Sequence, residues 1–327
     1  MGVAAPESLT GRPEPPSGRQ IRITHGDQEL VVTEVGATLR SYSVGDIPVL
    51  AGFAEDQMCP DARGQLLLPW PNRLGDGSYR FGGREHQLPI DEPELRNSIH
   101  GLTSWANWVA EPRGRARVAV HHQLHPRPGY PFNLRLTAQF DLDATGLTVS
   151  VSAVNAGTEP APFGAGAHPY VGVGTPVVDG CRLQVPARTY LLSDQRLLPL
   201  GRASVEGTEL DFRTGRAIGT TRLDTPYTDL IRDPDGVARV SLQAPDGRRV
   251  VVWLDETYRW VLVFTGDTNP DPGQWRTSLA VEPMTCPPDA FRSGEDLIVL
   301  EPGEAVTARW GIDVTGFRHL ARAARPG

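Results

Sequence analysis

The sequence predicts an all-β protein built as a large antiparallel β-sandwich. Short segments alternate apolar and polar residues, and turn-forming residues separate them at short intervals. No window of about eleven or more residues has a convincing helical period. Gly (35) and Pro (30) are abundant among the 327 residues, which suits many short strands joined by turns.

The chain is expected to form one domain with short extensions. Residues 1–19 are rich in Pro, Gly and charge, and they predict a disordered leader; residues 317–327 predict a flexible tail. Between them, residues 20–316 contain no internal repeat and no linker-like change of composition. We therefore expect a single sandwich domain over that range.

Two hairpins are predicted in the first third of the chain. Alternating residues at 21–33 are interrupted by a turn at 25–28, which indicates two paired strands. The same pattern recurs at 79–90, where Gly82 and Gly83 suit a primed turn.

The clearest strand pair covers residues 134–153. Apolar and polar residues alternate over 134–142 and again over 147–153, with a turn at 143–146, so one face is packed and the other solvated. Further strands are predicted at 238–243, 249–254, 259–264 and 305–314, and the third of these is apolar enough to be buried on both faces. One helical turn is expected near residues 289–292.

Charge and cysteine content exclude several classes of protein. The formal net charge is −7 and no basic run is interleaved with aromatic residues, so nucleic acid is not an expected partner. Cys59, Cys181 and Cys286 are odd in number and far apart, which indicates neither a disulfide framework nor a zinc site. No segment resembles a signal peptide or a membrane span, so we expect a cytoplasmic protein with no membrane partner.

Two ionisable residues each precede a proline. His168 lies in Phe163-Gly-Ala-Gly-Ala-His-Pro-Tyr170, and Glu282 lies in the apolar run Leu279-Ala-Val-Glu-Pro-Met284. Proline disfavours helical geometry in the residue before it, so both side chains are expected on extended backbone near strand ends. An isolated His168 would most simply be a buried structural histidine; paired with Glu282, it becomes a candidate for proton transfer.

The glycines beside His168 allow close approach. Gly164 and Gly166 let a ligand or a second strand come near the backbone. A carboxylate in surroundings as apolar as those of Glu282 must be paired, or its pKa must rise, as is typical of a general base.

Other polar residues stand among turn formers. Asn72 and Arg73 follow two prolines on a stiff turn, and Arg73 is either a surface charge or a fork that binds ligand oxygens. His100 precedes a glycine near Trp105, a combination that suits a sugar but also the packing of a core. Asp229, in Tyr227-Thr-Asp-Leu-Ile231, is either a turn acceptor or a fixed acceptor in a cleft, and by itself the turn is favoured.

Five ordered motifs resemble those of the aldose 1-epimerase (galactose mutarotase) family, over nearly the whole chain from Gln20 to Val314. They are Pro-Trp-Pro-Asn-Arg (69–73), Asn-x-x-His-Gly (97–101), Ala-His-Pro-Tyr (167–170), Tyr-x-Asp-Leu (227–230) and Val-Glu-Pro-Met-Thr (281–285). The resemblance implies a β-supersandwich, no metal and no cofactor, and interconversion of the α and β anomers of a free hexose. With such a substrate, Gly164 and Gly166 are expected to provide the room in which the pyranose ring lies.

The resemblance also implies roles for single residues. His168 matches the general acid and Glu282 the general base, while His100, Arg73 and Asp229 match residues that bind substrate and support the transition state. Asn72, Trp105 and Tyr170, which stand in or beside the same motifs, are further candidates for substrate binding. The sequence departs from the family at Val171, where many relatives have Phe, and at Leu102, where a second Gly is frequent; both positions could touch the sugar.

Two other functions stay open at this level. A sugar-binding or sugar-sensing protein without catalysis would use the same sandwich, since fold does not dictate function. A metal-dependent hydrolase could use His100, His168 and Glu282, but the spacing is not that of helical metal motifs, and the cluster His121-His-Gln-Leu-His125 is typical of a solvated strand. The expected partner is a monosaccharide, and the sequence does not decide between a monomer and a homodimer.

Overall fold

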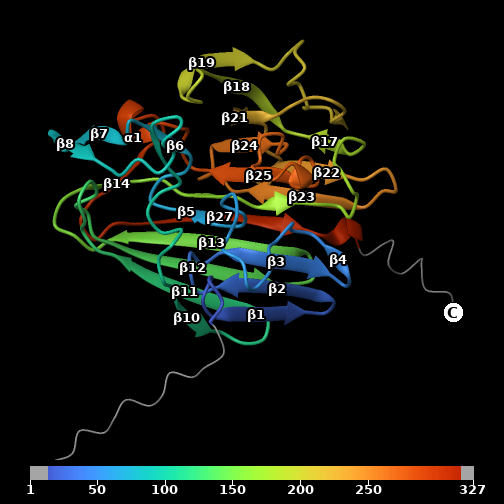
Figure 1. Ribbon diagram of the computed structural model, residues 1–327, viewed down its shortest axis with the longest axis horizontal. Coiled ribbons are helices and arrows are strands. Elements are labelled where there is room, and N and C mark those ends of the chain that lie inside the picture. The colour runs from blue at the N-terminus through green and yellow to red at the C-terminus, as the bar shows by residue number, and fades with distance from the viewer. Residues whose placement is uncertain (1–13, 318–327) are drawn as a thin grey trace, which may run out of the picture.

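Nearly all regular structure in the protein is antiparallel β-sheet (Figure 1). The computed structural model describes residues 14–317. The predicted all-β class is therefore confirmed, and so are the hairpins and the strand pairs proposed from alternation. The helical turn expected near residues 289–292 is α1 (Ala290–Ser293), and η1 (Pro272–Gln274) is a single turn of 3-10 helix.

The four-stranded sheet and part of the nine-stranded sheet lie in the lower half of the molecule in Figure 1, and the nine-stranded sheet continues into the right-hand side of the upper half. The four-stranded sheet consists, in order, of β1 (Gln20–His25), β2 (Gln28–Thr33), β3 (Leu39–Val44) and β4 (Ile47–Pro48). The nine-stranded sheet consists, in order, of β10 (Val109–Pro112), β11 (Arg117–Leu124), β12 (Leu134–Leu142), β13 (Gly146–Asn155), β27 (Ala305–Asp313), β23 (Arg249–Leu254), β22 (Ala238–Gln243), β17 (Arg182–Gln184) and β20 (Arg216–Ala217).

Most labelled strands of the eight-stranded sheet lie in the upper half of Figure 1, and this sheet holds the strands that carry the candidate site. Its order is β19 (Pro199–Ser204), β18 (Ala187–Ser193), β21 (Asp224–Leu230), β24 (Trp260–Phe264), β25 (Leu279–Met284), β15 (Gly166–Ala167) and β5 (Leu66–Leu67), and β16 (Tyr170–Val171) also pairs with β25. Three small two-stranded sheets pair β6 (Arg73–Gly75) with β9 (Asn97–Ile99), β7 (Ser78–Phe81) with β8 (Arg84–Gln87), and β14 (Ala161–Phe163) with β26 (Ile298–Leu300).

The alternation along β12 and β13 produces the main core. The apolar residues of β12 are buried and the polar ones between them are more exposed, as the pattern predicts. The same large cluster of buried side chains includes residues from the four-stranded and the eight-stranded sheets. Burial of this apolar surface is the main stabilising contribution to the sandwich.

The eight-stranded sheet is apolar on both faces near its centre. Along β24, Val261 and Val263 belong to the main core, whereas Trp260 and Leu262 pack with Met284 in a second, smaller cluster. Because neighbouring residues of a strand point to opposite faces, these two clusters lie on opposite sides of the sheet. The strand predicted to be buried on both faces is thus confirmed.

The ends of the domain differ slightly from the expected boundaries. Ser17 is buried and its carbonyl accepts the Val35 N–H, and the Arg19 carbonyl accepts the Glu34 N–H, so these residues pack with the domain. Phe317 is also buried. The rest of the expected leader and tail, residues 1–13 and 318–327, lies outside the described residues. Among residues 14–317, no helix has the length and apolar character needed to cross a membrane.

Candidate active site

Strand register brings His168 and Glu282 together. Gly166 lies opposite Met284 and Tyr170 lies opposite Ala280, so counting inward from both pairs places His168 opposite Glu282. His168 Nε2 is 3.2 Å from Glu282 Oε1. Both residues are buried, with exposed fractions of 6% and 1%.

The backbone around His168 is held on two sides. The His168 N–H donates to the Gln65 carbonyl, and the Gly64 N–H donates to the His168 carbonyl. On the other side, the Val281 N–H donates to the Pro169 carbonyl. The extended conformation predicted before Pro169 is therefore fixed by neighbouring strands, which sets the direction of the imidazole ring.

The glycines of this segment make room for the chain, not for a sugar. A Cβ atom on Gly166 would lie 2.6 Å from Pro71 Cβ, and one on Gly164 would lie 2.5 Å from Cys286 Sγ. These distances are shorter than van der Waals contact, so both positions require glycine for packing. The expectation that they provide space for a pyranose ring is wrong, and the alternative of a close second segment is correct.

Burial dominates the pKa of both members of the pair. It raises the pKa of Glu282 well above its usual range, an effect that the charge of Asp224 increases and that of Arg73 opposes. Burial lowers the pKa of His168 to about 3, with smaller contributions from Arg63 and Arg73 in the same direction. Burial therefore favours the neutral carboxylic acid of Glu282 and the neutral imidazole of His168.

Each member of the pair has one buried polar atom without a partner. Among the described residues, neither His168 Nδ1 nor Glu282 Oε2 makes a hydrogen bond. Unpaired buried polar atoms are costly and rare in folded proteins, and a functional site is one of the usual reasons for them.

His100 is held as a hydrogen-bond donor by Asn72. Both residues have positive φ, 62° and 58°, and the His100 N–H donates to the Asn72 carbonyl. In return the Asn72 N–H donates to His100 Nδ1 over 3.3 Å. Loss of hydration lowers the pKa of His100 well below its usual value, and the charges of His168 and Arg73 act in the same direction, although part of the surface of His100 stays exposed. With Nδ1 as acceptor in a neutral ring, the proton is on Nε2.

The ring of His100 lies beside the pair. Its centroid is 5.4 Å from that of His168, and the two rings are nearly perpendicular. The Asn72 side chain, expected to bind substrate, is buried and its Oδ1 accepts the Arg73 N–H. Asn72 therefore orients its neighbours and has little surface for a ligand.

Arg73 is paired with a carboxylate that the sequence did not single out. Arg73 Nε donates to Glu92 Oε2 and Arg73 Nη2 donates to Glu92 Oε1, each over 2.9 Å. The side chains are 14% and 18% exposed, so Arg73 is not a solvated surface charge. Its charge influences the pKa of His100, His168 and Glu282, which places it within electrostatic reach of all three.

The structure brings Asp224, not Asp229, to this cluster. Asp229 is exposed near the end of β21, has a φ of 52°, and lines a separate polar cavity. Across the sheet, Pro226 lies opposite Leu262, which lies opposite Glu282, so these three side chains share a face. Asp224 is on that face by strand alternation, whereas Asp229 is an odd number of positions from Pro226.

Electrostatics agree with this geometry. The charge of Asp224 raises the pKa of Glu282. The pKa of Asp224 is itself raised, because the surrounding protein reduces its hydration, and the charge of Arg73 partly opposes this increase. Asp224 is exposed, as suits a group that meets a ligand. The assignment of substrate binding to Asp229 is corrected accordingly. Alternation along residues 224–230 was the feature that could have identified Asp224, whereas nothing in the sequence pointed to Glu92.

Tyr170 supports the site from behind. It is buried, its ring stacks on the His168 ring at 4.9 Å, and the Arg63 guanidinium lies 4.5 Å from its ring centroid. Tyr170 is thus a packing partner of His168 and not an open platform for a sugar. Trp105 is 60% exposed and, within residues 14–317, makes neither a hydrogen bond nor a ring contact.

The two departures from the family pattern lie in packed positions. Val171 is 1% exposed and belongs to the main core, so it does not touch a ligand in the site. Leu102 packs partly against the same core, and its N–H donates to the Leu68 carbonyl.

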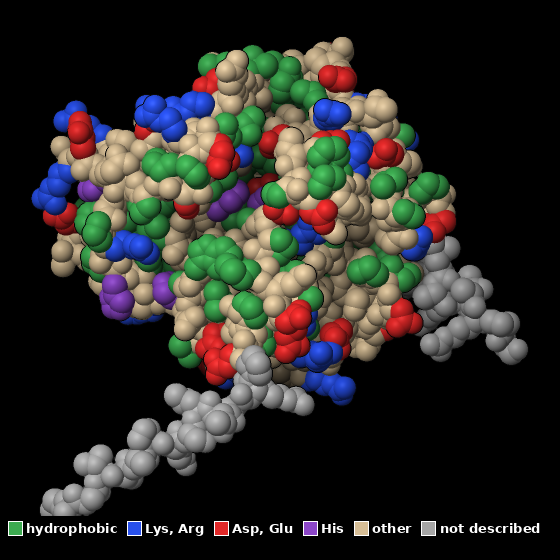
Figure 2. Space-filling view, viewed as in Figure 1, with side chains coloured by type: hydrophobic (Ala, Val, Ile, Leu, Met, Phe, Trp, Pro, Cys, Tyr) green, Lys and Arg blue, Asp and Glu red, His purple; other side chains and the backbone are tan. Residues whose placement is uncertain are grey.

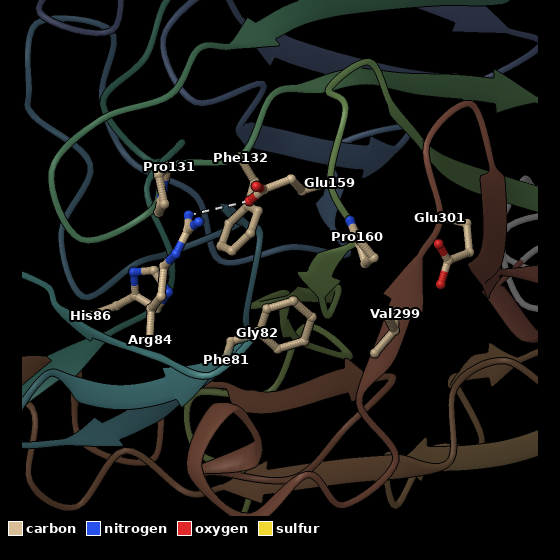
Figure 3. Close-up of a pocket in the computed structure, with 10 residues that line it drawn as sticks. All are labelled: Phe81, Gly82, Arg84, His86, Pro131, Phe132, Glu159, Pro160, Val299 and Glu301. Carbon is tan, nitrogen blue, oxygen red and sulfur yellow. Dashed lines mark hydrogen bonds and ion pairs between the residues drawn. The ribbon is translucent and has the colours of Figure 1, made fainter.

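The surface above the eight-stranded sheet is hollowed. Figure 2 shows histidine atoms at the bottom of a hollow near the middle of the view, close to β25 in Figure 1, with acidic side chains around it. A separate cavity of about 490 Å³ lies beside β7 and β8, where Arg84 and Glu159 are joined over 3.4 Å (Figure 3). It contains none of the predicted site residues; its lining is Phe81, Gly82, Arg84, His86, Pro131, Phe132, Glu159, Pro160, Val299 and Glu301.

The histidine cluster at 121–125 is part of the sheet surface. His121 bonds to Glu111 and Thr137 through its two ring nitrogens, and His122 Nδ1 donates to the Asn107 carbonyl. In the part of the chain that the structure describes, no group of at least 3 His, Cys, Asp or Glu side chains is arranged to hold a metal ion.

Comparison with known proteins agrees with the geometry. The family model described as Aldose 1-epimerase matches residues 19–313. The chain is 33% identical to the uncharacterized protein YihR of Escherichia coli K12 over 289 residues, which covers 88% of this chain and 91% of that protein. It is 30% identical to mouse galactose mutarotase over 201 residues, 57% of each chain.

A solved structure supports the fold. A putative aldose 1-epimerase from Escherichia coli K12 superposes with a TM-score of 0.77 at 23% identity, covering 90% of this chain and 98% of that one. At this identity the likeness shows a shared galactose mutarotase-like sandwich.

Proposed function

Since the chain belongs to the aldose 1-epimerase family, we propose that it interconverts the α and β anomers of a free hexose of the glucose or galactose type. The observation that carries this proposal is the buried pair of His168 and Glu282, whose Nε2 and Oε1 atoms lie 3.2 Å apart. Mutarotation needs such a pair, because one group must take a proton while the other gives one.

The proposed reaction opens the pyranose ring. Glu282 removes the proton from the anomeric O1 hydroxyl, and His168 delivers a proton to the ring oxygen O5, which yields the aldehyde. Rotation about C1–C2 and the reverse transfers then close the other anomer. Each positioned proton transfer contributes about 10²–10⁴-fold, which suffices for a reaction that proceeds slowly in water.

These roles require the proton to be on His168 when the sugar is bound. In the empty site burial favours the proton on Glu282. The O1 hydroxyl would replace the direct contact between the two side chains and donate a hydrogen bond to the Glu282 carboxylate, which lowers its pKa. Arg73 acts in the same direction.

Three neighbouring residues have complementary roles. The Nε2–H of His100 would donate to a sugar oxygen whose negative charge grows on ring opening, and Arg73 would supply a second donor. Asp224 would accept hydrogen bonds from ring hydroxyls and so fix which face of C1 meets Glu282. Donors and acceptors held before substrate arrives cost little to organise.

A sugar-binding protein without catalysis is the second candidate. It would keep Asp224 and Arg73, but it would have no use for a buried ionisable pair, whose desolvation costs stability. The retention of both His168 and Glu282 therefore favours an enzyme.

Polarimetry tests the proposal. Purified protein is added to freshly dissolved α-D-glucose or α-D-galactose, and the approach to anomeric equilibrium is followed. We expect faster relaxation, and we expect Glu282→Gln and His168→Asn to abolish it while thermal melting shows an intact fold. Uncatalysed relaxation with every hexose tested, together with sugar binding seen by tryptophan fluorescence, would favour the binding protein.

A further inference from the structure

We propose that Glu92 is a positioning residue that fixes the Arg73 guanidinium for contact with substrate. This inference rests on the proposed function and extends it to a residue outside all five sequence motifs. Glu92 would act through Arg73 and would not itself touch the sugar.

The contact between the two side chains is bidentate. Glu92 Oε1 accepts from Arg73 Nε over 3.1 Å and from Arg73 Nη2 over 2.9 Å, and Glu92 Oε2 accepts from Arg73 Nε over 2.9 Å. Within residues 14–317, Arg73 Nη1 has no partner, so it is the nitrogen left for a ligand. A planar guanidinium held on one edge presents its remaining N–H groups in a fixed direction.

Glu92 is itself held in place. Its N–H and carbonyl pair with those of Asn97, both over 3.1 Å, and Asn97 Nδ2 donates to Glu92 Oε2 over 2.8 Å. Asn97 is fully buried and also donates to the Arg196 carbonyl over 3.1 Å. Arg73 therefore packs against an anchored carboxylate, and it need not lose side-chain freedom when substrate binds.

Glu92 also balances charge at the site. The charges of Arg73 and Glu92 offset one another, while Asp224 and Glu282 are two further carboxyl groups within electrostatic reach of Arg73. Without Glu92, the positive charge of Arg73 would act uncompensated on Glu282 and His168, which already respond to it. His100 and Arg63 are the other basic groups near His168, and both stay in place in the variants below.

A purely structural role for Glu92 is the competing explanation. The residue could merely close the loop between β8 and β9. Asp91 offers a matched control, because it is the adjacent carboxylate on that loop, its Oδ1 accepts the Ile99 N–H over 2.8 Å, and it makes no contact with Arg73.

The experiment compares Glu92→Gln, Glu92→Asp and Asp91→Asn with the unmodified protein by polarimetry across pH. For Glu92→Gln we expect kcat/KM to fall by about 10- to 100-fold, as for loss of a charge-assisted hydrogen bond. The alkaline limb of its pH profile, the pH range in which kcat/KM falls as pH rises, should move to lower pH. The reason is that the charge of Arg73, no longer offset by Glu92, favours the carboxylate form of Glu282. Glu92→Asp should lower kcat/KM without moving that limb, and Asp91→Asn should change melting temperature only.

A Glu92→Gln variant with unchanged kcat/KM and an unchanged pH profile would overturn the inference. An Asp91→Asn variant with the same kinetic changes as Glu92→Gln would also overturn it. A measurement independent of activity separates this question from the proposed function. The Glu282 carboxyl is titrated by ¹³C NMR, assigned by its loss in Glu282→Gln, with and without the Glu92→Gln change. A lower midpoint in the variant supports the role of Glu92 even if the protein epimerises no hexose, and an unchanged midpoint contradicts it.

Discussion

Replacing Asp224 by Asn is the sharpest test of the substrate site, because the same strand supplies its control. Asp224 and Asp229 are both exposed aspartates of β21, but only Asp224 lies on the face of the sheet that carries Glu282. The two substitutions remove the same charge from the same strand. They differ in whether that charge is near the proposed sugar.

The structure sets the expected size of each effect. A hydrogen bond to a charged group contributes about 1.5–3 kcal/mol, so Asp224→Asn should lower kcat/KM by roughly 10- to 150-fold. Because the charge of Asp224 raises the pKa of Glu282, its removal should also move the alkaline limb of the pH profile to lower pH. Asp229→Asn changes an exposed residue without hydrogen bonds to the site, and its effect should stay within about 0.5 kcal/mol, or roughly 2-fold.

The assay is polarimetric relaxation at several concentrations of an α-hexose, with thermal melting to confirm that both variants fold. An Asp229→Asn variant as impaired as Asp224→Asn would refute the face assignment. An Asp224→Asn variant within 2-fold of the unmodified protein would remove Asp224 from the site.

Four further outcomes are expected. Glu282→Gln should stabilise the protein increasingly as pH rises above about 4.5, because in the unmodified protein the raised pKa of Glu282 keeps its proton bound in the folded state after the unfolded state has lost it. A Glu282→Gln melting temperature equal to that of the unmodified protein at pH 8 would contradict this. The pH profile of kcat/KM should have a broad plateau, because activity requires one proton on the pair: at lower pH both His168 and Glu282 are protonated and no base remains, and at higher pH neither is protonated and no acid remains. A loss of activity on the acid side near the ordinary imidazole pKa of 6.5 would contradict the lowering of the His168 pKa to about 3. Gly166→Ala should lower stability by about 1–3 kcal/mol in chemical denaturation, since its Cβ would lie 2.6 Å from Pro71 Cβ, and a neutral effect would show that the segment yields. Dialysis against a chelator should leave the polarimetric rate unchanged, and a loss restored by a divalent cation would support the metal hydrolase.

Local sequence patterns were sufficient for most strands and for the central pair of the site. Alternation decides which residues of β12 face the core, since the period of a strand is the same along its length. Prolines after His168 and Glu282 indicated extended backbone at both positions, and the structure brings the two side chains into contact. Their contact depends on strand register, which is a long-range property.

The errors have a common physical cause. Asp229 and Asp224 differ by which face of β21 they occupy, and a motif does not reveal which strand lies opposite. Glu92 can be identified only from its contact with Arg73, and these two residues are not neighbours in the sequence. Tyr170 was a candidate for substrate binding, but it is buried, with its ring stacked on His168 and the Arg63 guanidinium close to its ring.

The pairing of β25 with two short strands limits how this site can change during evolution. Gly166 and Tyr170 fix the ends of the segment that carries His168, because each is paired with a residue of β25. Inserting or deleting one residue between them would turn the imidazole to the opposite face of the sheet, away from Glu282. Homologous proteins can therefore vary the side chains of this segment, but a change in its length would separate His168 from Glu282.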